Sequence, residues 1–130
     1  MPSATLVHSL AVVAAPPQRA NPGDSPMIAM FRHWAAQARH IQNNLKGDAQ
    51  IDAGCDVENV IIDAMLNTPA RDVLDMAALA WVALVSSCTN DCDNPATVDP
   101  TAGFPVAVKF QEVAAAMFPE LLAIAKGEAA

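Results

Sequence analysis

The sequence predicts an all-α protein: a small bundle of about four helices, the last one kinked at Pro119, with a mobile N-terminal tail. Three observations support this fold class. Alanine, the strongest helix former, supplies 27 of the 130 residues. Apolar residues recur every three or four positions, which is the spacing of one helix face. A capping residue directly precedes proline at three places, which is typical of a helix start. These pairs are Ser25–Pro26, Thr68–Pro69 and Asp99–Pro100.

Residues 1–24 are expected to form a flexible tail ahead of a single helical domain over residues 25–130. Residues 14–26 contain four prolines, which end any preceding regular element. The apolar stretch at residues 6–15 has part of the pattern of a secretory signal, but no Lys or Arg precedes Arg19, so we expect no export. No apolar run reaches the roughly 18 residues that span a bilayer. Three cysteines, an odd number, make no disulfide framework, so we expect a cytoplasmic protein without membrane contact.

The first helix is predicted over residues 26–46, with Ser25 as its cap and Gly47 as its stop. Its apolar residues are spaced alternately four and three positions apart, which predicts a seam that packs against another helix. The seam consists of Met27, Phe31, Trp34, Ala38, Ile41 and Leu45.

Two further helices are predicted over residues 53–67, capped by Asp52, and over 69–87, capped by Thr68. The apolar face of the first is Val57, Val60, Ile61, Ala64 and Met65. The buried stripe of the second is Leu74, Ala77, Ala78, Trp81, Leu84, Val85 and Cys88. The far side of this second helix is also apolar. Such a helix is usually central to its bundle or covered by a second subunit.

The last helix is predicted to begin near Phe104 or Pro105, after a loop over residues 89–103, and to stop at Gly127. Pro119 lies inside this helix and removes one backbone hydrogen bond, so it should kink the helix or split it after Phe118. The expected buried face is Val106, Phe110, Val113, Met117, Leu121 and Ile124.

Charge is unevenly distributed along the chain, whose formal net charge is −7. Residues 26–47 carry three bases and no acid, whereas residues 48–75 sum to −6. The bases repeat every seven residues, with a histidine beside two of them. This candidate interaction face is Arg32, His33, Arg39, His40 and Lys46. It either docks an acidic partner or is a solvated face that balances the acidic helix of the same chain. The acidic total argues against direct binding to nucleic acid.

No motif for catalysis or cofactor binding occurs, so we assign no catalytic, cofactor-binding or metal-ligating residue, and the sequence gives little support for an enzyme. Cys88 and Cys92 form a C-x3-C pair, but no second pair of ligands completes a zinc site. The acidic loop around Asp91 resembles a calcium loop, yet Ala96 and Ala102 occupy the positions that require Gly and Glu.

Residues 26–34 (PMIAMFRHW) and 65–74 (MLNTPARDVL) resemble short helical proteins encoded in phage-derived regions of bacterial genomes. The resemblance covers residues 24–85 and rests on helix punctuation. It implies a cytoplasmic helical accessory protein and assigns no site residue.

These observations favour a non-enzymatic accessory protein that acts through protein–protein interaction or self-association, with a homo-oligomer or an unknown protein as its partner. Two alternatives stay open. One is a metal- or thiol-dependent activity at Cys88 and Cys92. The other is an acidic mimic that inhibits a nucleic-acid-binding protein, based on the −6 segment.

Overall fold

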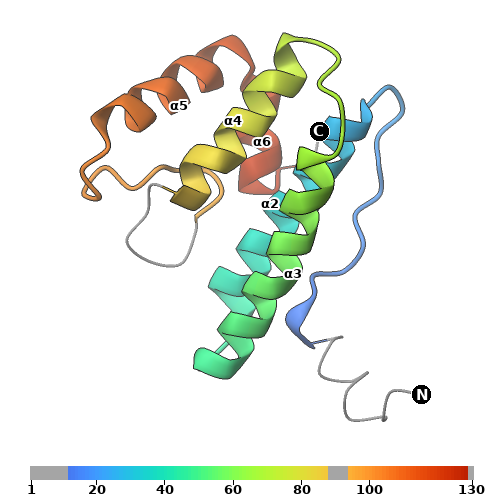
Figure 1. Cartoon of the computed structure of the whole chain (residues 1–130), viewed down its shortest axis with the longest axis vertical. Helices are drawn as coiled ribbons and strands as arrows, with labels where there is room; N and C mark the ends of the chain where they lie inside the picture. The colour runs from blue at the N-terminus through green and yellow to red at the C-terminus, as the bar shows by residue number, and fades with distance from the viewer. Residues whose placement is uncertain (1–11, 88–93, 129–130) are drawn as a thin grey trace.

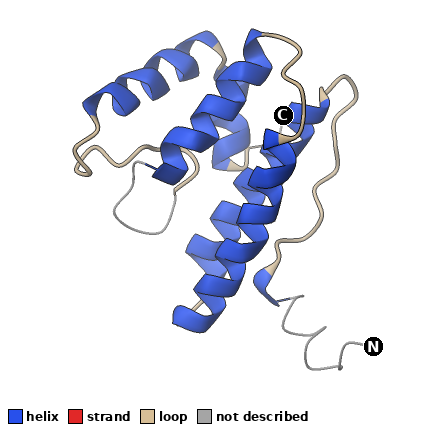
Figure 2. Cartoon of the chain, viewed as in Figure 1, coloured by secondary structure: helices blue, strands red, loops and turns tan. Residues whose placement is uncertain are grey.

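The computed structural model describes residues 12–87 and 94–128, and within these ranges it is all-α, with five helices and no strand (Figures 1 and 2). Helices α2 and α3 run side by side in opposite directions and form a long pair, and α4, α5 and α6 pack around one end of it. The bounds are α2 Pro26–Asn44, α3 Asp48–Leu66, α4 Val73–Ser87, α5 Pro105–Met117 and α6 Pro119–Lys126. The predicted fold class is confirmed, and the described residues contain five helices where about four were predicted.

Helix α2 begins as predicted. The Ser25 hydroxyl accepts a hydrogen bond from the backbone N–H of Ile28 at 3.1 Å, and Pro26 occupies the first helical position. Every residue of the predicted seam, from Met27 to Leu45, is buried. Helix α2 contacts α3, α4 and α6 and has more buried residues than any other of the five helices, so it lies at the centre of the fold.

Helix α3 begins at Asp48, so the predicted start at residue 53 with an Asp52 cap is wrong. Gly47, at φ +77°, turns the chain directly from α2 into α3. Gly54, a poor helix former, lies within α3 and allows α2 and α3 to approach closely, since an added Cβ would lie 2.5 Å from Leu45 Cδ1. Val60, expected on the buried face, is exposed.

The pair Thr68–Pro69 does not start a helix, which corrects the predicted beginning of α4. The Thr68 hydroxyl donates to the carbonyl of Ala64 at 2.7 Å and so belongs to the end of α3. Helix α4 begins at Val73, and its cap is Asp72, whose Oδ1 accepts from the backbone N–H of Asp75 at 2.9 Å.

The pair Asp99–Pro100 makes a turn rather than a helix start. Asp99 Oδ1 accepts hydrogen bonds from the backbone N–H and the hydroxyl of Thr101 at 2.8 and 2.7 Å, and the next helix begins only at Pro105. Of the three predicted cap-proline pairs, Ser25–Pro26 is thus the one that starts a helix.

Pro119 splits the last predicted helix into α5 and α6 instead of kinking it. Phe118 stands between them at φ −131° and ψ 73°, outside helical geometry. Gly127, at φ +77°, ends α6 as predicted. The buried residues of α5 are Ala107 and Ala114. Val106, Val113 and Met117, which the periodicity assigned to the core, are exposed.

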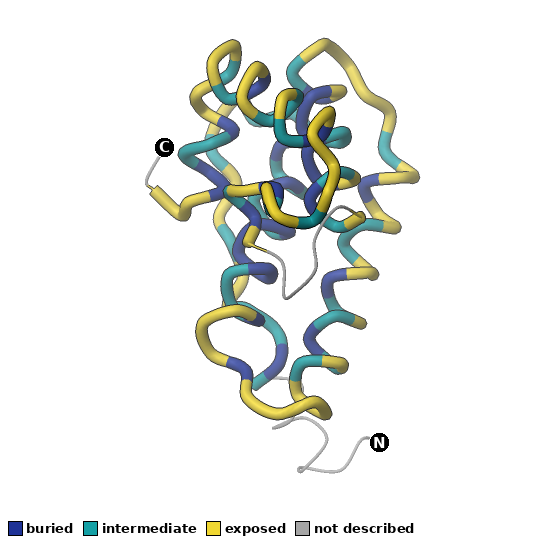
Figure 3. Tube along the Cα trace, turned by 90° about the vertical axis from the view of Figure 1, so that its left-hand side faces the viewer, coloured by how far each residue is buried: buried dark blue, intermediate teal, exposed yellow. Residues whose placement is uncertain are grey.

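The largest core side chains meet where α2 and α4 cross. The ring of Phe31 stacks on Trp34 with centroids 5.5 Å apart and meets Trp81 edge-on at 6.3 Å. Figure 3 shows the buried positions gathered along the inner sides of the helices. Helix α4 is not central to the bundle, because Val73, Met76 and Ala83 on its outer side are exposed.

Residues 12–24, which the sequence assigned to a flexible tail, lie along α2 and α3 (Figure 1). The buried amide of Gln37 fastens them: its Nε2 donates to the carbonyls of Val13 and Gly54, and its Oε1 accepts from the backbone N–H of Ala15. Residues 1–11, the rest of that predicted tail, lie outside the described residues.

Candidate functional site

The five basic residues proposed as an interaction face lie on α2 and just after it, but the structure does not leave them as one free surface. Arg32 donates through Nε and Nη2 to the two carboxylate oxygens of Asp24, at 2.7 and 3.3 Å. His40 Nε2 lies 2.6 Å from the carbonyl oxygen of Val12. His33 is partly buried, and Lys46 is exposed.

The Asp24–Arg32 pair ties the N-terminal segment to the first half of α2. Burial by itself raises the pKa of Asp24. Hydrogen bonds from the Arg32 side chain and from the backbone N–H of Asn21, together with the charge of Arg32, outweigh burial and hold that pKa below its ordinary value. The carboxylate is therefore ionised at neutral pH, and the pair fixes the entry into α2.

Arg39 caps the carboxyl end of α6. Its Nη1 donates to the carbonyl oxygens of Ile124 and Ala125 at 2.8 and 2.9 Å. A cation at this end of a helix satisfies orphan carbonyls and complements the helix dipole. Burial lowers the pKa of the guanidinium, which stays protonated at every physiological pH.

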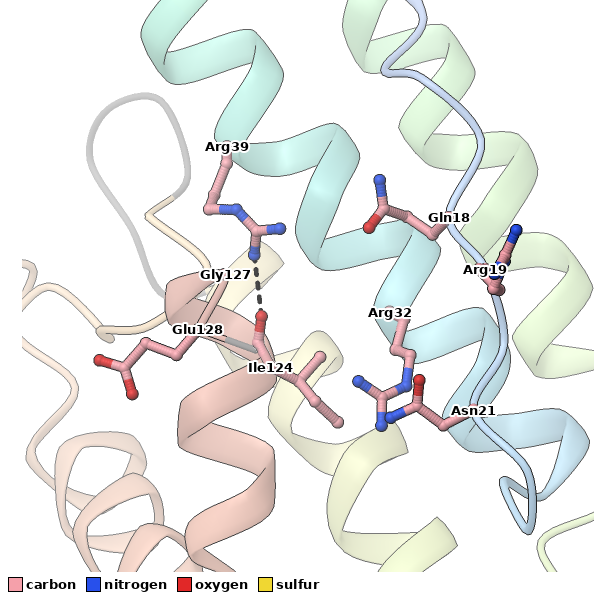
Figure 4. Close-up of a pocket in the computed structure, with 8 residues that line it drawn as sticks. All are labelled: Gln18, Arg19, Asn21, Arg32, Arg39, Ile124, Gly127 and Glu128. Atoms are coloured by element: carbon pink, nitrogen blue, oxygen red, sulfur yellow. Dashed lines mark hydrogen bonds between the residues drawn. The ribbon is translucent and has the colours of Figure 1, made fainter. Parts of the chain in front are cut away.

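Arg32 and Arg39 also line one cavity of about 320 Å³ between α2, the N-terminal segment and the end of α6 (Figure 4). The other lining residues are Gln18, Arg19, Asn21, Ile124, Gly127 and Glu128. Two of the five predicted residues are thus brought together here. Docking of an acidic partner by the whole stripe stays a prediction, and the arginines bond within the chain rather than to solvent alone.

A second feature, which the sequence anticipated on α4 but not on α5, is an apolar groove between these two helices with a volume of about 270 Å³. We call it the α4–α5 face, and it is lined by Val73, Met76, Ala77, Ala80, Phe110, Val113, Ala114, Met117 and Phe118. Val73, Met76 and Met117 each leave more than 60% of their surface exposed. In the sequence, this face is indicated by α4, which has one charged residue; because that residue, Asp75, is buried, the outer side of α4 carries no charge.

Three buried polar side chains are engaged within the chain: Gln37, described above, and two carboxylates. Glu58 accepts from the indole N–H of Trp34 at 3.0 Å. Asp75 accepts from the Ser25 hydroxyl and from the backbone N–H of Arg71. Because the Ser25 hydroxyl also caps α2, this contact holds the start of α2 against the start of α4.

Cys88 and Cys92, the candidate metal or thiol pair, lie outside the described residues, as does Asp91 in the acidic loop. Among residues 12–87 and 94–128 there is no group of three or more His, Cys, Asp or Glu side chains that could hold a metal ion. Within the same ranges, no helix has the length and apolar content needed to cross a membrane.

Comparisons of the chain with protein-family models, with curated proteins and with solved structures found no match.

Proposed function

We propose that this chain is a small, non-enzymatic helical protein that self-associates, and that the α4–α5 face is where a second copy packs. The resemblance to phage-encoded helical proteins suggests an accessory role as the biological context. The observation that carries the proposal is the set of large apolar side chains left exposed around one groove.

The α4–α5 face is apolar from one side to the other. Val73, Met76 and Ala80 follow one another along the outer side of α4, and Val113 and Met117 lie on α5. Removing apolar surface from water contributes about 25 cal/mol per Å². Contiguous apolar surface of this kind marks interaction sites in soluble proteins, and methionine side chains adapt readily to a partner surface.

The local charge of the α4–α5 face allows a second copy of the same chain as the occupant. The protein carries −7 overall, so two copies repel over most of their surface. The nearest charged side chains on α5 are Lys109 and Glu112, which form an ion pair at 4.0 Å and sum to zero. A twofold contact places the same patch against itself, which requires a patch that is apolar or electrically balanced. The α4–α5 face meets that requirement.

This proposal also accounts for α4. The sequence allowed two explanations for a helix that is apolar nearly all round, a central position or a covering subunit. Because α2 is the central helix and α4 is exposed on its outer side, the covering subunit is the explanation we retain.

Size-exclusion chromatography with light scattering tests the proposal at protein concentrations from about 5 to about 500 µM, a range that brackets a micromolar dissociation constant. We expect a dimer whose population rises with concentration. Met76→Glu and Met117→Glu place charges on the α4–α5 face and should give monomers. Val60→Glu is the matched control, because Val60 is an exposed apolar residue of α3 outside that face.

A wild-type protein that stays monomeric across the whole range contradicts the proposal. So does a dimer that withstands Met76→Glu and Met117→Glu, or one that Val60→Glu dissociates equally. Far-UV circular dichroism of each variant shows that the monomers are folded.

A further inference from the structure

The cavity at the end of α6 is lined mainly by positively charged side chains, although the protein as a whole is acidic. Three arginines and one glutamate line it, and the Asp24 carboxylate pairs with Arg32, so these five side chains together carry +1, whereas the whole chain carries −7. In Figure 4 the side chains of Arg32 and Arg39 extend from successive parts of α2 toward the same opening, and the Glu128 carboxylate points away from Arg32. Such a concave patch concentrates small anions.

Arg39 offers a donor edge that its structural role does not use. Its Nη1 makes both hydrogen bonds to the end of α6. Among the described residues, neither Nε nor Nη2 donates to a protein acceptor, and no carboxylate oxygen lies within 4.0 Å of this guanidinium. The Nε and Nη2 hydrogens point in parallel and match two oxygens of one carboxylate or phosphate group.

Gly127 holds the guanidinium in place. A Cβ built on Gly127 would lie 2.8 Å from Nε, 2.9 Å from Cζ and 3.2 Å from Nη2 of Arg39. The backbone of Gly127 therefore lies against the guanidinium, and the two hydrogen bonds of Nη1 to the end of α6 set its position before any ligand arrives. Because the Nε and Nη2 donors of Arg39 are already positioned, little side-chain entropy is lost when a ligand binds.

Arg32 and Gln18 supply further donors on the other walls. Arg32 uses Nε and Nη2 for Asp24, which leaves Nη1, and Gln18 Nε2 uses one hydrogen for the carbonyl of Pro16 at 3.1 Å. Arg19 lines the cavity too, although its guanidinium extends away from the other two in Figure 4, so it contributes mainly attraction at a distance.

We propose that this cavity binds a small anionic molecule through a carboxylate or phosphate group, held by the Nε and Nη2 edge of Arg39 with Arg32 and Gln18 around it. A volume of about 320 Å³ suits a metabolite-sized ligand rather than a polymer. The site is independent of the α4–α5 face, because the two share no lining residue.

Isothermal titration calorimetry tests this site with two probes, inorganic phosphate and succinate, each added at constant ionic strength against a chloride control. We expect saturable binding at a single site for one or both probes. The probe that binds more tightly identifies the phosphate or the carboxylate as the preferred group. No saturable heat for either probe up to about 10 mM, a concentration at which even a millimolar site is filled, overturns the proposal.

Variants connect the binding to Arg39. Arg39→Lys keeps the charge and removes the fork, and should weaken binding roughly tenfold, as expected for loss of a charge-assisted hydrogen bond. Lys126→Gln is the matched control: it removes an exposed cation of α6 that does not line the cavity, and should leave the affinity within about twofold. Equal affinity in wild type and Arg39→Lys, or an equal loss in Lys126→Gln, overturns the proposal.

Arg39→Lys also removes the cap of α6, so a second variant keeps the test valid if that protein unfolds. The double variant Gln18→Ala and Arg19→Gln alters only the N-terminal segment, outside the core. We expect its thermal unfolding to match wild type and its affinity to fall severalfold. Unchanged affinity in this variant counts against the site as surely as unchanged affinity in Arg39→Lys.

Discussion

Trp34 and Glu58 pair inside the interface of α2 and α3, where the indole N–H donates to the carboxylate across 3.0 Å and both side chains are buried. Because both side chains are closed to water, no water molecule can replace the indole N–H as a donor to Glu58 if Trp34 is changed. A buried carboxylate that loses a donor retains the full cost of its desolvation.

Trp34→Phe should therefore lower the free energy of unfolding by about 1–3 kcal/mol through the lost bond, in addition to the packing it removes. Urea denaturation measures this. Trp81→Phe is the comparison, because the indole of Trp81 is equally buried but donates to a neutral carbonyl, that of Pro95, at 2.7 Å. We expect the smaller loss for Trp81→Phe; a larger one would mean that the side chain of Glu58 is no stronger an acceptor than a backbone carbonyl.

The close approach of α2 and α3 at Gly54 gives a second prediction. A Cβ at Gly54 meets Leu45 Cδ1 at 2.5 Å and Ile41 Cγ1 at 3.0 Å. Gly54→Val should cost about 1–3 kcal/mol because both side chains have to move. Ala49→Val, at an exposed site of the same helix, should cost only about 0.5 kcal/mol through helix propensity. Similar midpoints in urea for the two variants would show that the helices have room at Gly54.

Gly54 also shows where sequence reasoning is limited. Propensity treats a glycine in a helix as a weakness, whereas here the missing side chain lets two helices touch. Glu58 is a similar case, since a charged residue is counted as exposed by pattern. Yet Gly54, Glu58 and Met65 are the buried residues of α3, and their spacing of four and seven is that of one helix face.

Helices α2 and α5 explain why one buried face was predicted and the other was not. In α2 the large apolar residues fall on one side only, so periodicity identifies the core. In α5 both sides are apolar, and the side with small residues, Ala107 and Ala114, is the one that packs. The prediction followed the spacing of the larger apolar side chains and so placed Val106 and Met117 in the core, whereas the structure leaves both exposed.

The candidate interaction face, too, could be predicted only in part. The seven-residue repeat placed Arg32 and Arg39 on one side of α2, which the structure confirms. Their partners could not be predicted, because Asp24 and the carbonyls of Ile124 and Ala125 reach them only through the tertiary fold. Repeats report which residues of one helix share a face, and they carry no information about what that face meets.

The Asp24–Arg32 pair predicts a pH-dependent contribution to stability. The pKa of Asp24 is lower in the folded chain than its ordinary value of 3.8, so the pair stabilises the fold above that value and this stabilisation is lost as pH falls through the folded-state pKa. Asp24→Asn should lower the free energy of unfolding at pH 7, and the difference from wild type should shrink as pH drops below 3.8. Urea denaturation at a series of pH values measures it.

Glu112→Gln is the control for that series. Glu112 pairs with Lys109 at 4.0 Å with both side chains largely exposed, so its removal should change stability by less than about 0.5 kcal/mol at any pH. A difference between Asp24→Asn and wild type that is constant with pH would contradict an ionised, paired Asp24.

Gly127 and Gly47 allow the contact with Arg39 to be separated from the general cost of alanine at a glycine with positive φ. Both have φ +77°, but ψ is 17° at Gly127, in the left-handed helical region, and 153° at Gly47, in a region confined almost entirely to glycine, so the backbone penalty is larger at Gly47. A Cβ at Gly47 meets nothing within 4 Å, whereas one at Gly127 meets the guanidinium of Arg39 at 2.8 Å. Both variants should lower the unfolding free energy by about 1 kcal/mol or more, but only Gly127→Ala should displace the cap of α6. Hydrogen exchange of the last amides of α6 separates the two effects: these amides should exchange faster only in Gly127→Ala. Unchanged exchange at the end of α6 in Gly127→Ala would mean that Arg39 does not hold the end of that helix.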